Sequence, residues 1–136
     1  VRRMAAPWRQ AEIDHVVAID ARGFLVGSAL AYELGTGLVI VRKAGKLPHE
    51  TASVSYDLEY GSATVEIHVD AFETGRRALV VDDLLATGGT AAATVELIES
   101  TGGVVVGCGF VIELDALGGR RHLAGHRIES LIRVAG

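Results

Sequence analysis

The stretch that decides the fold is Leu79-Val80-Val81-Asp82-Asp83-Leu84-Leu85-Ala86-Thr87-Gly88-Gly89-Thr90. It begins with apolar residues that suit a buried parallel strand, and this strand is expected to end where the two acids begin. A loop of small residues follows and opens a helix that continues through Glu99. Open α/β sheets bind their ligands at the carboxyl ends of such strands. The stretch therefore predicts a ligand site between a strand and a helix.

The polar groups of the same stretch indicate the chemistry of the ligand. Glycine lets the backbone come close to a phosphate, threonine hydroxyls donate hydrogen bonds, and the free N–H groups of a helix start attract an anion. Asp82 and Asp83 can accept hydrogen bonds from a vicinal diol. A phosphate beside a diol predicts a site for ribose 5-phosphate. The expected phosphate-loop residues are Ala86, Thr87, Gly88, Gly89 and Thr90.

This segment resembles the phosphoribosyl pyrophosphate (PRPP) signature of the type I phosphoribosyltransferases. The alternative is a strand that ends in a solvated, charged turn before a glycine-rich helix start. A Walker A loop is excluded because no Gly-Lys-Ser/Thr follows the glycines. A dinucleotide-binding fold is disfavoured because the acids precede the glycines instead of following them by about twenty residues.

Composition limits the class of protein. The 136 residues, of which 49% are hydrophobic, predict a single domain over residues 1–136. With a net charge of −4 and no basic tract in the sequence, nucleic acid is not an expected partner. The lone Cys108 is expected to be a buried small hydrophobe in a reducing compartment. Because no apolar run reaches the roughly 20 residues of a membrane helix, we expect a soluble, cytoplasmic protein without a membrane partner.

Apolar runs alternate with helical patterns along the chain, which is typical of βα units and a mostly parallel sheet. A helical stripe of Leu25, Ala29, Leu30 and Leu34 predicts a helix that Gly35 can terminate. The expected helices are 24–34 and 89–100, and the expected strands are 16–19, 38–41, 79–81, 104–112 and, at an edge of the sheet, 128–134. The sequence therefore predicts an α/β fold with a mostly parallel sheet flanked by helices, and the resemblance implies the Rossmann-like core of the type I phosphoribosyltransferases.

Residues 53–70 break this pattern. Val54, Tyr56 and Leu58 alternate with polar residues, and an equivalent alternation runs from Val65 to Val69. This predicts a two-stranded antiparallel excursion with a turn near Tyr60-Gly61.

The stretch Ile19-Asp20-Ala21-Arg22-Gly23-Phe24 is a second strand end followed by a tight turn and a helix start. By itself it is equally well a routine βα turn with an exposed arginine. Beside the acidic loop it resembles the pyrophosphate loop of the adenine phosphoribosyltransferases. That resemblance implies that Ala21, Arg22 and Gly23 contact the diphosphate and the edge of the base.

A third motif, Val41-Arg42-Lys43-Ala44-Gly45-Lys46-Leu47-Pro48, carries three cations, which suit a pyrophosphate leaving group whose charge grows as its bond breaks. Its alternative is a solvated surface loop. From Arg42 through Gly61 the chain resembles the flexible catalytic loop of the adenine enzymes, expected here at about residues 43–65. The resemblance implies that Lys43 and Lys46 meet the pyrophosphate and that Arg42 reaches the partner subunit of a homodimer.

Glu59 and Tyr60 belong to the same loop motif. Glu59 is the candidate acid or base for the purine N7, because enclosure of a carboxyl raises its pKa toward the working pH, and its alternative is an ordinary turn carboxylate. Tyr60 is expected to help close the loop over the substrate. Leu114 follows a predicted strand, and the resemblance implies that it packs on the face of the purine; otherwise it is a core leucine.

Together these resemblances imply an adenine phosphoribosyltransferase, a pentosyltransferase of purine salvage. PRPP and adenine would give AMP and pyrophosphate, and Mg²⁺ would be held mainly by the substrate with no direct protein ligand. One departure is that no Phe-Arg-Asp-type motif precedes Val16, so the N-terminal hood over the base is expected to be incomplete and activity reduced. The alternatives are a hypoxanthine, guanine or xanthine phosphoribosyltransferase and a non-catalytic regulator that binds PRPP. His122 and His126 are expected to be surface residues.

Overall fold

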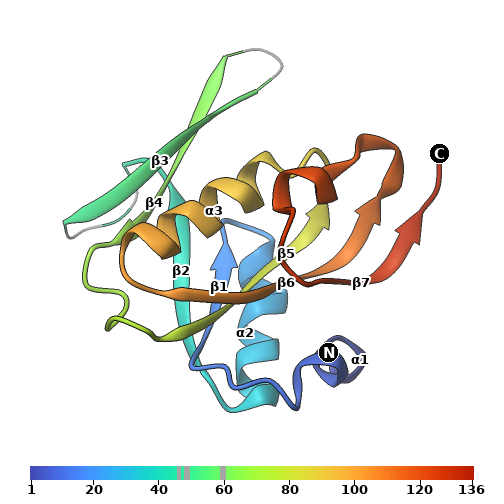
Figure 1. Cartoon of the computed structure of the whole chain (residues 1–136), viewed down its shortest axis with the longest axis horizontal. Helices are drawn as coiled ribbons and strands as arrows, with labels where there is room; N and C mark the ends of the chain where they lie inside the picture. The colour runs from blue at the N-terminus through green and yellow to red at the C-terminus, as the bar shows by residue number, and fades with distance from the viewer. Residues whose placement is uncertain (46, 48–49, 59–60) are drawn as a thin grey trace.

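The computed structural model describes residues 1–45, 47, 50–58 and 61–136 (Figure 1). Helices and strands alternate through most of the chain, as predicted. The helices α1, α2 and α3 span Arg2–Ala5, Gly23–Leu34 and Gly89–Ser100. Short 3-10 helices η1, η2 and η3 span Ala6–Trp8, Asp115–Leu117 and Gly119–Leu123. The strands are β1 (His15–Ile19), β2 (Gly37–Lys43), β3 (Thr51–Asp57), β4 (Ser62–His68), β5 (Arg77–Leu85), β6 (Val104–Leu114) and β7 (Ile128–Val134).

The strands form one mixed sheet in the order β3-β4-β2-β1-β5-β6-β7. From β2 to β7 the neighbours are parallel, whereas β4 pairs antiparallel with both β2 and β3. The predicted antiparallel excursion is therefore the β3–β4 hairpin, which stands out from one end of the sheet (Figure 1). The predicted α/β architecture, including the edge strand at 128–134, is confirmed.

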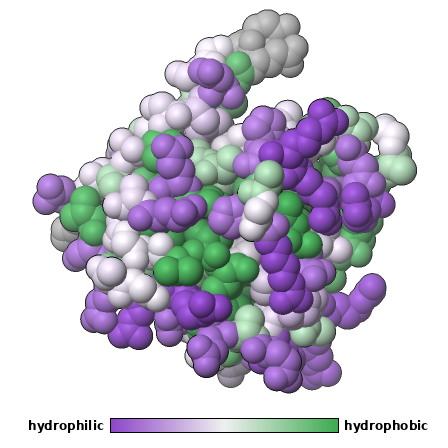
Figure 2. All heavy atoms as spheres, in the orientation of Figure 1, coloured by the Kyte–Doolittle hydropathy of each residue, from purple (hydrophilic) through white to green (hydrophobic). Residues whose placement is uncertain are grey.

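Helices cover both faces of the sheet because residues of the central strands alternate between two buried clusters. Val16 packs with α1 and α2, whereas the next residue, Val17, packs on the opposite face with Leu97 and Ile98 of α3. Burial of each such side chain contributes about 1.5 to 3 kcal/mol. Figure 2 shows hydrophobic side chains gathered in the middle of the viewed face, with hydrophilic ones around them.

The expectation that the third parallel strand ends at Val81 is wrong. β5 continues through Leu85, so Asp82 and Asp83 lie inside a strand instead of following it. The reason is unequal pairing: β1 pairs with β5 only as far as Val81, but β6 continues to pair with it as far as Leu85. The acids therefore sit where one neighbour of β5 has ended and the other continues.

The predicted helix at residues 24–34 is present as α2, and within its apolar stripe Leu25 is 81% exposed. The face of α2 that meets the sheet is built from smaller residues. A Cβ added to Gly27 would lie only 2.5 Å from the Cβ of Ala18, so this helix packs closely on β1. Leu30 and Ala31 complete the buried face. The close approach of Gly27 to β1, and not the spacing of the leucines, determines which face of α2 meets the sheet.

The short helices at the N-terminal end of the described chain are not among the predicted elements. Met4, Ala5 and Trp8 are buried on the α2 face of the sheet. Arg127 covers the Trp8 ring, its guanidinium carbon 4.5 Å from the ring centroid. In the part of the chain that the structure describes, no helix is long and apolar enough to cross a membrane.

Candidate active site

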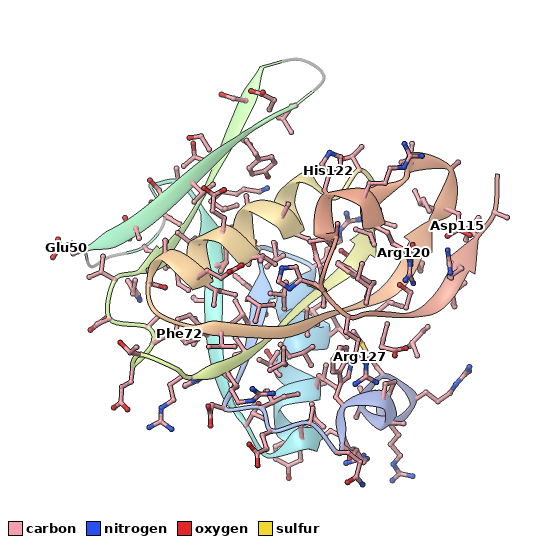
Figure 3. All side chains as sticks on the ribbon, viewed as in Figure 1. Glu50, Phe72, Asp115, Arg120, His122 and Arg127 are labelled. Atoms are coloured by element: carbon pink, nitrogen blue, oxygen red, sulfur yellow. The ribbon has the colours of Figure 1, made fainter. Side chains whose placement is uncertain are left out.

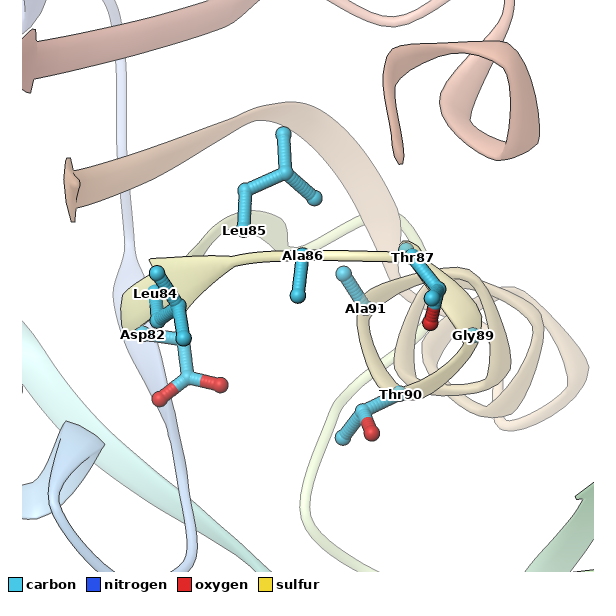
Figure 4. A pocket seen from close by; sticks show the side chains of 9 residues that line it. Asp82, Leu84, Leu85, Ala86, Thr87, Gly89, Thr90 and Ala91 are labelled. Atoms are coloured by element: carbon cyan, nitrogen blue, oxygen red, sulfur yellow. The ribbon is translucent and has the colours of Figure 1, made fainter. Parts of the chain in front are cut away.

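The expected phosphate loop lies between β5 and α3 and lines a pocket of about 80 Å³ (Figure 4). Asp82 flanks the pocket on the strand side and Thr90 on the helix side. Gly88 has a φ of 88°, in the left-handed region that favours glycine. Because α3 begins at Gly89, unpaired N–H groups of its first turn face this region. The pocket therefore offers backbone donors and two hydroxyls to an anion.

The loop is backed by the segment after β6. A Cβ added to Gly88 would lie 2.5 Å from the carbonyl oxygen of Gly119, and one added to Gly119 would lie 2.6 Å from that of Ala86. Two glycines thus let two backbones touch. The sequence indicated Gly88 as a phosphate-loop residue but gave no signal that Gly119 supports it.

The acid pair is held at the strand side of the pocket. The Asp82 carboxylate accepts a hydrogen bond from the Asp83 N–H at 2.8 Å. Burial is the largest influence on the Asp82 carboxyl and raises its pKa to about 7, against the lowering effects of the Asp83 N–H and Arg22. The Asp83 carboxylate is paired with Arg22 at 3.1 Å. One acid is therefore partly protonated near neutral pH, and the other is tied to the neighbouring turn.

The turn Ala21-Arg22-Gly23 lies directly beside these acids. An added Cβ at Gly23 would lie 2.9 Å from the Asp82 Oδ1 atom and 3.2 Å from the Val81 carbonyl oxygen, so only glycine fits without a shift. The Asp20-Ala21 peptide bond is cis. The structure thus brings together two motifs that are separated by about sixty residues in the sequence.

The basic end of β2 joins the same site through Asp20, a residue for which the sequence had indicated no role. The Asp20 carboxylate accepts a hydrogen bond from the Lys43 N–H at 3.3 Å and is paired with the Arg42 guanidinium at 3.5 Å. Arg42 also lies over the Phe24 ring of its own chain, 5.8 Å from the centroid. Its reach into a partner subunit stays a prediction, and Lys46 lies outside the described residues.

The hairpin contacts the phosphate loop through Tyr56, which the sequence suggested only as an alternating strand residue. Its hydroxyl lies 2.8 Å from Thr90 Oγ1 and 3.4 Å from Lys43 Nζ. The expected turn is closed by the Leu58 N–H, which donates to the Gly61 carbonyl at 2.9 Å. The two other residues expected in this loop, Glu59 and Tyr60, lie outside the described residues.

A buried carboxylate stands at the end of β6, next to the half-buried Leu114. Glu113 is 3% exposed and accepts hydrogen bonds from Arg120 at 2.7 and 3.0 Å and from the Ser130 hydroxyl at 2.7 Å. Burial opposes ionisation of Glu113, but these hydrogen bonds and the charges of Arg120 and Arg133 lower its pKa below the ordinary value. Arg120 lies in the turn that supports the phosphate loop (Figure 3).

Two histidines lie near the end of η3. His122 is exposed, as expected (Figure 3). His126 is only partly exposed, and its Nε2 atom lies 4.0 Å from Glu99 Oε1. Among the residues that the structure describes, no three His, Cys, Asp or Glu side chains are grouped to hold a metal ion. Cys108 is buried, as expected, and burial raises the pKa of its thiol to about 12.

Comparison with known proteins assigns the arrangement to a family. Residues 1–129 match the family described as phosphoribosyl transferase domain. An adenine phosphoribosyltransferase of Acidothermus cellulolyticus is 54% identical over 98% of this chain and 76% of the relative.

Two solved structures extend this similarity to three dimensions. An adenine phosphoribosyltransferase from Thermoanaerobacter pseudethanolicus is 50% identical with a TM-score of 0.95, over 98% of this chain and 77% of the other. The enzyme from Saccharomyces cerevisiae, solved with an imino-altritol bisphosphate and adenine, is 42% identical with a TM-score of 0.88 over 96% of this chain and 73% of the other.

Proposed function

The chain belongs to the phosphoribosyltransferase family, and within it to the adenine phosphoribosyltransferases, and from this premise we propose how its residues serve the reaction. In that reaction the 5-phosphoribosyl group of PRPP is transferred to adenine, giving AMP and pyrophosphate in purine salvage. The observation that carries the residue assignment is the meeting of three motifs at one sheet edge. The Asp82–Asp83 pair lies between the phosphate loop and the Arg22 turn.

PRPP would place its 5-phosphate on residues 86–90, where N–H groups and hydroxyls converge. Its ribose hydroxyls would donate to the acids at the strand side of the pocket. Asp83 suits this role as a carboxylate already paired with Arg22. Asp82, with its pKa raised to about 7, supplies either a carboxylate or a protonated carboxyl near neutral pH.

The pyrophosphate of PRPP would lie between the Ala21-Arg22-Gly23 turn and the basic end of β2. Bond breaking at C1 leaves an oxocarbenium-like sugar and a growing negative charge on the leaving oxygen. Arg22, which is paired with Asp83, and Lys43, whose backbone N–H donates to Asp20, would meet that charge together with Lys46. Preorganised charges of this kind are worth several kcal/mol to the transition state.

Adenine would attack C1 through N9 from the face opposite the leaving group. Leu114, half-buried at the end of β6, would pack on the purine. Glu59 would exchange a proton with the purine N7, and Tyr60 would help close the hairpin over the bound substrates. A closed site excludes water, which protects the oxocarbenium-like sugar from hydrolysis.

Mg²⁺ would be held mainly by the phosphate and pyrophosphate oxygens of PRPP, with no direct protein ligand, while the Asp82 and Asp83 carboxylates face the ribose hydroxyls. When bound, the ion would neutralise charge on the pyrophosphate. The chain's own contribution is to hold the ribose and the leaving group in line for attack.

A homodimer and a cytoplasmic location complete the proposal. Leu25 and Tyr32 of α2 are 81% and 92% exposed, an unusual state for large hydrophobic residues seven positions apart on one helix. They suit burial against a second copy of the chain. The buried thiol of Cys108 suits a reducing compartment.

The first test is isothermal titration of PRPP with magnesium into the purified chain, followed by adenine and an assay for AMP. We expect PRPP to bind and AMP to form. Binding without AMP formation would favour a PRPP-binding regulator, and AMP formation replaced by IMP, GMP or XMP formation with other bases would favour another purine phosphoribosyltransferase. Failure to bind PRPP would overturn the proposal.

A further inference from the structure

Tyr56 connects two parts of the candidate site that belong to different motifs. Its hydroxyl lies 2.8 Å from Thr90 Oγ1 at the start of α3 and 3.4 Å from Lys43 Nζ at the end of β2. Its ring covers the glycine before Thr90, since a Cβ added to Gly89 would lie 3.2 Å from Tyr56 Cδ2. The hairpin therefore contacts the phosphate loop through a phenol hydroxyl.

The chemistry of the three groups fixes one of these hydrogen bonds and favours one direction for the other. A lysine ammonium only donates, so the Tyr56 oxygen accepts from Lys43. The Tyr56–Thr90 hydrogen bond is compatible with either donor, and the phenol, whose oxygen already accepts from Lys43, has its single proton to donate to Thr90 Oγ1. The Thr90 hydroxyl, having accepted this bond, keeps its own single proton for another acceptor. Chains of this kind also polarise each member, which strengthens the final donor.

That remaining proton has one acceptor of the right kind in the proposed complex. Thr90 lines the pocket that would receive the 5-phosphate of PRPP, together with Thr87 and the backbone of the glycines. Hydrogen bonds to a charged acceptor are roughly twice as strong as neutral ones. An oriented Thr90 hydroxyl therefore favours phosphate over water in the pocket.

We propose that Tyr56 is a positioning residue for the 5-phosphate: its hydroxyl, set by Lys43, turns the Thr90 proton into the phosphate loop. This inference rests on the proposed function and adds to it a residue that acts on substrate only through Thr90. It also gives the β3–β4 hairpin an effect on phosphate affinity, exerted through Thr90. The competing explanation is that Tyr56 only packs the hairpin against Gly89.

The test is Tyr56→Phe, which removes the hydroxyl and keeps the ring on Gly89. We expect the dissociation constant for ribose 5-phosphate and the KM for PRPP each to rise about tenfold. Pyrophosphate affinity, kcat with saturating PRPP and the melting temperature should stay near those of the unmodified chain, because the lost contact serves only one end of the substrate.

Ser55→Ala is the matched control. It removes a hydroxyl from the neighbouring residue of the same strand, where Ser55 Oγ lies 2.7 Å from Thr64 Oγ1 of the paired strand β4. We expect it to leave both ligand affinities unchanged. A Thr90→Val background supplies the second test: there, Tyr56→Phe should have no further effect on ribose 5-phosphate binding, because the residue through which Tyr56 acts is gone.

The outcomes separate this inference from the function on which it rests. If the unmodified chain makes AMP but Tyr56→Phe binds ribose 5-phosphate equally well, Tyr56 has no positioning role. If Tyr56→Phe weakens ribose 5-phosphate and pyrophosphate alike and lowers the melting temperature, Tyr56 is a packing residue and the inference is wrong. If the unmodified chain binds neither PRPP nor ribose 5-phosphate, the proposed function fails first.

Discussion

The phosphate loop and the β3–β4 hairpin both contribute to the candidate site, yet they are held in different ways. The loop continues a central strand into a helix and is backed by the chain at Gly119, backbone against backbone. The hairpin joins the sheet through a short antiparallel pairing of β4 with Arg42 and Lys43, and it reaches the loop through Tyr56. Backbone packing preforms one half of the site, whereas side-chain hydrogen bonds attach the other half.

The largest expected effect breaks the backbone packing of the loop. Gly88→Ala adds a Cβ at a φ of 88° and 2.5 Å from the Gly119 carbonyl oxygen. We expect a loss of about 2 to 5 kcal/mol in the free energy of unfolding and a fall in activity of about a hundredfold. Denaturant titration and the AMP assay measure the two effects.

Gly75→Ala is the control for Gly88→Ala, because Gly75 has a similar φ of 86° but nothing within 4 Å of an added Cβ. Gly75→Ala should lower the free energy of unfolding by about 1 to 2 kcal/mol and leave kcat unchanged. Equal losses for the two variants would show that the contact with Gly119 is unimportant.

The next largest effect concerns the buried ion pair of Arg120 with Glu113, next to the turn that supports the phosphate loop. Arg120→Met leaves the buried Glu113 carboxylate without its two shortest guanidinium bonds. We expect a loss of about 2 to 4 kcal/mol in the free energy of unfolding and a higher KM for PRPP, because the turn with Gly119 shifts. Arg9→Met, which breaks the exposed Arg9–Glu33 pair, should cost less than about 1 kcal/mol. Similar losses of stability for Arg120→Met and Arg9→Met in thermal unfolding would contradict the idea that the buried ion pair contributes more than the exposed one.

A third effect separates stability from function at the acid pair. Because the pKa of Asp82 is raised from 3.8 to about 7, the folded chain holds this proton more tightly than the unfolded one. The resulting stability is complete below pH 3.8 and is lost as the pH rises through about 7.

Asp82→Asn, which cannot ionise, should therefore raise the free energy of unfolding by about 1 to 2 kcal/mol at pH 8 while lowering activity. At pH 4 the substitution should have little effect on stability. Asp70→Asn, at an exposed site, is the control and should change neither the free energy of unfolding nor the activity. Denaturation of all three chains at both pH values checks this, and a loss of stability at pH 8 for Asp82→Asn would contradict the raised pKa.

The smallest effect compares one substitution in both regions. Thr94 is fully buried in α3, and its hydroxyl donates to the Thr90 carbonyl at 2.8 Å. Thr94→Val should cost about 1 kcal/mol. In the hairpin, the Thr64 hydroxyl lies 2.7 Å from that of the exposed Ser55. Thr64→Val should therefore change the free energy of unfolding by less than about 0.5 kcal/mol. Thermal unfolding measures both losses of stability. A larger loss for Thr64→Val than for Thr94→Val would contradict the idea that the loop is held more firmly than the hairpin.

Much of the site could be predicted from sequence because its chemistry is local. The order of apolar strand, acids, small residues and helix is written in consecutive positions, so residues 82–90 were assigned together. The alternation around Val54 and Val65 likewise predicted the hairpin, since each strand carries its own period. The exposure of Leu25 could not be predicted, because helical spacing does not tell which face of an apolar helix meets the sheet, and the close approach of Gly27 to Ala18 decides this.

Supporting residues were missed for a related reason. Asp20, Glu113 and Gly119 make their contacts with residues that are distant in the sequence or that lie across a turn, and nothing in their neighbours marks them. Tyr56 showed only the alternation of a strand residue. This pattern indicates on which face of the strand the side chain lies, but not that it hydrogen-bonds to Thr90. An acidic residue directly after the predicted strand 104–112 is a signal that could have drawn attention to Glu113.

By itself the sequence determined the succession of strands and helices and the family, and it predicted the residues of the phosphate loop, since these follow from short-range order along the chain. Only the tertiary structure decided that Asp82 lies within β5, that Gly119 backs Gly88 and that Tyr56 hydrogen-bonds to Thr90. The physical reason is that strand length, burial and hydrogen-bond direction depend on which segments become neighbours, and that choice is made by packing of the whole core.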